Sequence, residues 1–134
     1  MRKIRVMVIS SFQDLADDYV FLCELEGHNA IAVTDMTQVL PSVEVYQPDL
    51  IIIQWYNATD TDRFVRWFAG QFPIILISTF PYSDDVKLQS HLFGFRCYSM
   101  PMTIDEIDNM VQEIERLSAP LRADLEWLDL NPTK

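Results

Sequence analysis

Five polar side chains stand where apolar runs of the sequence end. Ser10 and Ser11 follow one such run, Gln54 ends a second, and Ser78 and Thr79 close a third. Hydroxyl and amide groups can hydrogen-bond a phosphate or another polar ligand. None of the five is a carboxylate, so two hydroxyls cannot replace the acids that a magnesium site requires. We therefore expect a polar site that can bind or fill space, and no covalent chemistry.

The apolar runs alternate with segments of helical periodicity. We predict strands at 3–9, 29–33, 49–53, 73–78 and 95–99, and helices at 13–26, 36–46, 60–70, 83–93 and 103–117. The third and fourth strands are uninterrupted apolar runs, which is typical of strands buried on both faces of a parallel sheet. The pattern predicts an α/β fold: a doubly wound, five-stranded parallel sheet with helices on both faces. Sites in such folds lie beyond the carboxyl ends of the strands.

Composition excludes several classes of protein. The chain has 134 residues, enough for one domain, and a net charge of −10, which disfavours direct contact with nucleic acid. No apolar run is long enough to cross a membrane. There are three glycines, none in a GxGxxG or P-loop arrangement, so a dinucleotide site and a P-loop are not expected.

The cysteines and histidines give no catalytic or metal-binding pattern. Cys23 and Cys97 lie far apart without a CxxC partner, which argues against a disulfide framework and against zinc. We expect two buried free thiols in a reducing cytoplasm. His28 and His91 have no nearby nucleophile, so a hydrolytic triad is not expected.

Five segments together resemble the receiver domain of bacterial response regulators. They are VMVISSFQD, ELEGHNAIAV, YQPDLIIIQWYN, FPIILIST and YSMPMTIDEI, and the resemblance covers residues 3–117. It implies a flavodoxin-like sheet with strand order 2-1-3-4-5 and a role in two-component signal transduction. We accordingly divide the chain into a receiver-like domain at 1–118 and an amphipathic tail helix or linker at 119–134.

The resemblance also identifies what the chain has lost. Receiver domains carry an acid pair after the first strand, a phospho-accepting Asp ending the third, a Ser or Thr ending the fourth, and a Lys before the Pro that follows the fifth. Those positions are here Ser10 and Ser11, Gln54, Ser78, and Met100. Only Ser78 fits, so the resemblance implies a degenerate receiver, or pseudo-receiver, that is no enzyme and needs no metal or cofactor.

Two interpretations of Gln54 remain open at this stage. The side chain either fills the vacated site and hydrogen-bonds Ser10, Ser78 or backbone, or it also mimics a fixed signalling state. An alternative function is a flavodoxin-like domain that binds a small ligand in a pocket of Ser10, Ser11, Ser78 and Thr79.

Protein partners are the expected mode of action. Four residues are candidates for a switch or an interface, on the basis of the resemblance or of their aromatic character: Thr79, Tyr98, Trp55 and Tyr56. The resemblance implies a homodimer through the helix at 83–93, the strand at 95–99 and the helix at 103–117, and a cis bond between Met100 and Pro101. Leucines at 121, 125 and 128 make the tail amphipathic; it would pack on its own domain, begin a linker or contact a second copy.

Overall fold

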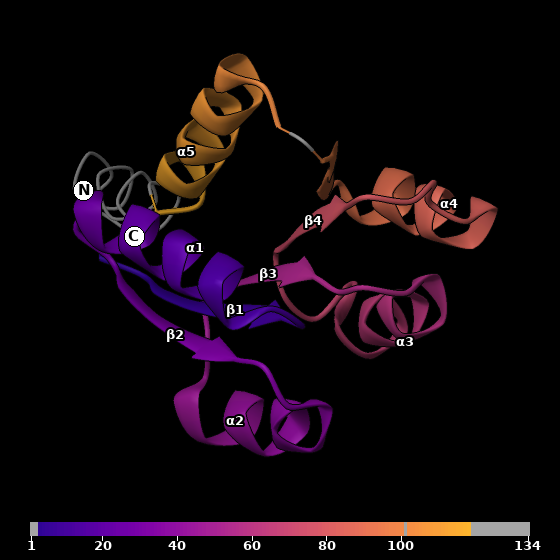
Figure 1. The fold of residues 1–134 in the computed structure, drawn as a ribbon, viewed down its shortest axis with the longest axis horizontal. Helices are drawn as coiled ribbons and strands as arrows, with labels where there is room; N and C mark the ends of the chain where they lie inside the picture. The colour runs from indigo at the N-terminus through magenta and orange to yellow at the C-terminus, as the bar shows by residue number, and fades with distance from the viewer. Residues whose placement is uncertain (1–2, 101, 119–134) are drawn as a thin grey trace, which may run out of the picture.

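A five-stranded parallel sheet in the order β2-β1-β3-β4-β5 forms the centre of the described chain. The computed structural model describes residues 3–100 and 102–118 (Figure 1). The strands are β1 (Arg5–Ser10), β2 (Asn29–Val33), β3 (Leu50–Gln54), β4 (Ile74–Ser78) and β5 (Arg96–Ser99). The helices are α1 (Gln13–Leu25), η1 (Met36–Gln38, a 3-10 turn), α2 (Val39–Tyr46), α3 (Ala58–Phe68), α4 (Asp84–Phe93) and α5 (Ile104–Ser118). The predicted fold class and strand order are confirmed.

Each face of the sheet has its own hydrophobic core, because successive side chains of a strand point to opposite faces. On one face Val8, Leu50 and Ile52 pack with side chains of α1 and α5. On the other face Ile51 and Ile53 pack with side chains of α2, α3 and α4. Figure 1 shows α1 and α5 on one side of the strands and the other three helices across from them. All five residues of β3 and of β4 are buried, as the uninterrupted apolar runs predict.

One predicted helix is divided in two. The segment at 36–46 begins with the 3-10 turn η1, whose first residues are capped by the Asp35 carboxylate, which accepts the Thr37 N–H at 2.9 Å. The α-helix proper starts at Val39, which places Pro41 in its first turn. A proline is tolerated there because the N–H groups of the first turn have no partner within the helix.

The remaining helix starts follow the sequence signals. Thr103 and Glu106 form a capping box at the start of α5, with both reciprocal hydrogen bonds at 3.1 Å. Ser83 caps α4 by accepting the Val86 N–H at 3.1 Å. None of the helices in the described residues is long and apolar enough to cross a membrane.

Both cysteines are free thiols. Cys23 of α1 is buried in the core that this helix covers, and the burial raises the pKa of its thiol to about 12. Cys97 is only half-buried, which corrects the expectation of two buried thiols; burial still raises the pKa of its thiol. Since the thiolate is the reactive form, neither cysteine is poised as a nucleophile.

The sheet's central strand generates a stability prediction. Ile52 is fully buried in β3, so Ile52→Ala should lower the free energy of unfolding by about 2–5 kcal/mol through lost contacts and a cavity. Val45→Ala on α2 is the matched control: that side chain is 85% exposed, and its truncation should cost less than about 0.5 kcal/mol. Equal losses for the two variants in urea titrations would contradict this account of the core.

Candidate functional site

Ser10 and Gln54 meet at the carboxyl edge of the sheet. They are the last residues of β1 and β3, and the parallel register of these neighbouring strands pairs them directly. The Ser10 hydroxyl donates to Gln54 Oε1 at 2.9 Å, and both side chains are buried. The backbone joins at the same place, where the Ser11 N–H donates to the Gln54 carbonyl at 3.2 Å. The predicted hydrogen bond from Gln54 to Ser10 is therefore present.

The Ser10 hydroxyl also organises the turn into α1. It accepts the Phe12 N–H at 3.2 Å, and the Phe12 carbonyl lies at the same distance as a second possible acceptor. A hydroxyl has one proton, and the shorter contact to Gln54 is the better acceptor. One serine thus satisfies the buried amide oxygen and an N–H of the following loop.

Ser78 and Thr79, the hydroxyls after β4, do not join this pair. The Ser78 hydroxyl is fully buried and faces its own loop: it donates to the Phe80 carbonyl at 2.9 Å and accepts the Phe80 N–H at 3.0 Å. Thr79 is exposed. The four hydroxyls of the expected ligand pocket are therefore divided between two loops. Ser11 alone keeps a buried hydroxyl without a hydrogen-bond partner among the described residues.

Met100 occupies an apolar environment after β5. Its side chain packs against the core on the α1 and α5 side, and its sulfur accepts the Tyr19 hydroxyl at 3.8 Å. Its backbone N–H donates to the Ser78 carbonyl at 2.7 Å, which ties this loop to the end of β4. The Met100 side chain therefore packs in the core. The Lys that receivers carry at this position would instead interact with a phosphoryl group.

Tyr82 forms a contact that the sequence interpretation missed. Its hydroxyl, from the loop before α4, donates to the backbone carbonyl of Tyr98 in β5 at 2.5 Å. Burial raises the pKa of the Tyr82 hydroxyl far above its ordinary value, so it stays a proton donor at any physiological pH. This bond fastens the β4–α4 loop to the last strand; its only signal in the sequence is a Tyr within a Pro-Tyr-Ser loop.

Two of the four expected switch or interface residues lie in the core. Trp55 is 5% exposed, and its ring packs edge-on to Phe64 at a centroid distance of 5.1 Å. Tyr98 is 8% exposed and belongs to the core on the α1 and α5 side. Neither ring is exposed in this structure, and a switch role for either residue stays a prediction. Tyr56, at 60% exposure, does lie on the surface.

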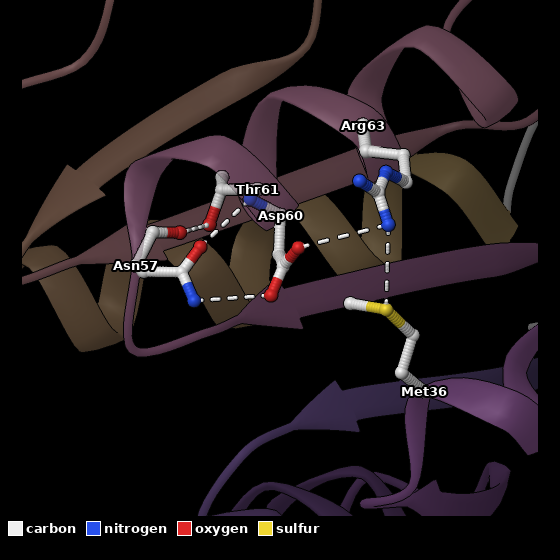
Figure 2. Close-up of polar contacts among 5 residues, drawn as sticks. All are labelled: Met36, Asn57, Asp60, Thr61 and Arg63. Atoms are coloured by element: carbon white, nitrogen blue, oxygen red, sulfur yellow. Dashed lines mark hydrogen bonds and ion pairs between the residues drawn. The ribbon is translucent and has the colours of Figure 1, made fainter.

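The loop after β3 is closed by a local network rather than by a ligand (Figure 2). The Asn57 side chain caps α3: its oxygen accepts the Asp60 N–H at 2.7 Å, and its amide donates to the Asp60 carboxylate at 3.0 Å. Arg63 lies 3.8 Å from the other Asp60 oxygen. Asp62 accepts the Ser83 hydroxyl at 3.2 Å. The helix therefore begins at Ala58 and not at the predicted position 60, because Asn57 is the cap.

Two expectations fall outside the described residues. Pro101, and with it the conformation of the Met100–Pro101 bond, is not described, and neither is the tail at 119–134.

Comparison with solved structures identifies this as the fold of response-regulator receiver domains. The BeF3-activated N-terminal receiver domain of RstA from Klebsiella pneumoniae matches with a TM-score of 0.61 at 12% identity, covering 87% of this chain and 98% of that one. A response regulator from Thermotoga maritima matches with a TM-score of 0.64 at 14% identity, over 87% of this chain and 98% of that one. NtrX from Brucella abortus, in complex with ATP, matches with a TM-score of 0.67 at 17% identity, over 96% of this chain and 29% of that chain.

No family model and no curated protein sequence matches the chain. At these low identities the structural likeness establishes the fold alone.

The residues at the carboxyl edge do not fit the magnesium ion of ordinary receivers. Ser10, Ser11 and Gln54 offer only neutral oxygens, and the best placed of them, Ser10 Oγ and Gln54 Oε1, bond each other. Mg²⁺ sites in proteins are built around carboxylates and phosphates. Within the described residues no group of three or more His, Cys, Asp or Glu side chains lies together.

The buried pair at the site generates a second prediction. In a double-mutant cycle of Ser10→Ala and Gln54→Met, the coupling free energy should be about 0.5–1.5 kcal/mol, the worth of a neutral hydrogen bond. The losses of unfolding free energy in the two single variants should add to more than the loss in the double variant. Each single variant leaves one buried polar group without its partner. Unfolding free energies that add to within about 0.3 kcal/mol would show that the two side chains do not interact.

Proposed function

We propose that the chain is a receiver-like regulatory module of bacterial signal transduction that acts without phosphorylation, through protein–protein contacts in the cytoplasm. The observation that carries this proposal is the buried Ser10–Gln54 hydrogen bond. It occupies the positions where the receiver resemblance expects an acid of the metal site and the phospho-accepting Asp.

The chemistry of the pair supports the proposal. An amide cannot act as the nucleophile toward a phosphoryl donor, because its nitrogen lone pair is delocalised into the carbonyl. The receiver resemblance implies a carboxylate as the phosphoryl acceptor, and none stands at the ends of β1, β3, β4 or β5. With neither nucleophile nor metal ligands, the module is not an enzyme.

The contacts around the site support a single fixed conformation. Tyr82 fastens the β4–α4 loop to β5, and Ser78 holds its own loop. Met100 packs into the core, so the loop before α5 is held as well. These bonds hold without any phosphoryl group, in line with the interpretation that Gln54 belongs to a constant signalling state.

The surface of α4 favours a self-association role. Leu88, Leu92 and Phe93 are 57%, 68% and 54% exposed on this one helix. Apolar side chains that gather on one element are typical of contact surfaces. Beside them Arg96 of β5 and Arg116 of α5 both approach Glu113, at 4.0 and 2.6 Å. We propose that α4, β5 and α5 form a homodimer interface.

A ligand-binding role is the second candidate. The buried Ser11 hydroxyl has no hydrogen-bond partner among the described residues, which favours a small polar ligand there. The other hydroxyls argue against it, since Ser10 and Ser78 are already engaged. A phosphate-containing compound that stays bound to the purified protein in native mass spectrometry would favour this candidate over the interaction module.

Phosphorylation chemistry gives the third prediction. Incubation with acetyl phosphate and Mg²⁺ should leave the intact mass unchanged, and the Gln54→Asp variant should behave likewise because Ser10 and Ser11 still provide no metal site. A stable gain of about 80 Da on the unaltered chain, one phosphoryl group, would overturn the proposal. A receiver domain with its full acid set, treated in parallel, is the positive control.

Self-association gives the fourth prediction. Sedimentation velocity at micromolar concentration should show a dimer, and Leu88→Ser/Leu92→Ser should shift it to monomer by removing apolar area from the interface. Val45→Ser, at an 85% exposed position on α2, is the matched control and should stay dimeric. A monomer at all concentrations, before and after deletion of 119–134, would refute the interface.

A further inference from the structure

An apolar groove of about 580 Å³ lies between α1 and the first half of α5. Its walls are mainly aliphatic side chains and methionines, including Leu15, Leu22, Leu25, Met102, Ile107 and Met110. The outer side chains are left open to water: Phe21 is 62%, Leu25 66% and Ile107 38% exposed. The groove lies on the face of the sheet opposite α4, so it is separate from the exposed leucines of α4, although α5 belongs to both surfaces.

The shape and the lining suit a helix. Two helices form the walls, and along α1 the lining runs from Leu15 to Leu25, roughly 15 Å at 1.5 Å per residue. Three methionines contribute, one of them Met100 at the position where a receiver carries its Lys. Unbranched methionine side chains adapt to the shape of a bound apolar surface, and amphipathic helices bind in such grooves.

The charge of the walls selects among amphipathic helices. α1 contains no Lys or Arg, and its exposed acids include Asp14, Asp17 and Asp18, the last of which lines the groove. α5 adds Asp105 and Asp108 near its start, both exposed. The one basic residue of α5, Arg116, lies 2.6 Å from Glu113 and is committed to that ion pair. Asp105 and Asp108 do not line the groove, so a bound segment with acidic flanks would meet like charge along α1.

We propose that this groove is a docking site for a basic amphipathic helix of a partner protein, with its apolar face toward the methionines and Lys or Arg side chains against the acids of α1. The other two candidate occupants carry the wrong charge. The chain's own segment 119–134 has three acids and two bases, which is a net charge of −1. A second copy would bring a further net charge of −10 and the same acidic α1.

Synthetic peptides of about 14 residues, long enough to run beside the lined part of α1, test the proposal directly. One peptide carries Leu at helical i, i+3, i+4 and i+7 spacing with Lys elsewhere; its counterpart keeps the leucines and has Glu in place of Lys. Fluorescence polarisation should show saturable binding of the Lys peptide and at least about tenfold weaker binding of the Glu peptide. Binding of the Lys peptide should weaken as salt is added.

Variants of the protein locate the binding site. Phe21→Ser/Leu25→Ser should weaken the Lys peptide by about tenfold or more, since it removes two large apolar contacts. Val45→Ser, at an 85% exposed position on α2, is the matched control and should leave binding unchanged. Asp14→Asn/Asp17→Asn/Asp18→Asn should weaken binding and flatten its salt dependence. All these side chains are exposed, and unchanged urea unfolding will verify that each variant folds.

Four results would overturn the proposal. They are equal affinity for the Lys and Glu peptides, no binding of the Lys peptide, binding that is insensitive to the Phe21/Leu25 variant, and a gain of more than about tenfold on deletion of 119–134, which would make the tail the occupant. If the protein is a dimer and Phe21→Ser/Leu25→Ser dissociates it, the groove binds a second copy. That result would also overturn the proposed partner helix. None of these readouts depends on Gln54, so the groove and the phosphorylation-independent function can fail separately.

Discussion

The hydrogen bond between Ser10 and Gln54 determines what the carboxyl edge of this sheet can do. It joins two central strands at their ends, inside the protein, with neutral groups on both sides. Carboxylates gathered at such a place repel each other and need a cation, or protonation, to be stable. A serine and a glutamine satisfy each other without one. This neutral pair is the basis of the proposal that the chain acts without phosphorylation.

The contacts around that bond are likewise made between groups of the protein itself. Tyr82 bonds the backbone of β5, Asn57 and Asp60 cap each other at the start of α3, and Met100 packs into the core. Under the proposed function the chain acts through its surfaces. Several of the large apolar side chains that remain exposed gather on α4 and along the α1–α5 groove, and α4 and α1 cover opposite faces of the sheet. These two surfaces are the ones that we propose for partner contacts.

Local sequence signals predicted the sheet, because buried parallel strands are long apolar runs and several helix starts carry a capping residue. The contact of Gln54 with Ser10 was one of the alternatives that the sequence offered, since neighbouring parallel strands end at one edge. The burial of Trp55 was not predicted because it depends on the ring of Phe64 in the next helix. The Tyr82 bond and the groove were missed because both depend on how α4 and α5 pack on the sheet, which no local pattern records.

The most direct test of the central claim is a titration of the amide NMR spectrum with Mg²⁺ and BeF3⁻, the activating anion named for the similar RstA receiver domain. The account predicts no saturable shifts for residues at the ends of β1, β3 and β4, because Ser10 and Gln54 already satisfy each other and supply no carboxylate. Saturable shifts at Gln54 and in the β4–α4 loop, spreading to α4, would show a working phosphate switch and contradict it.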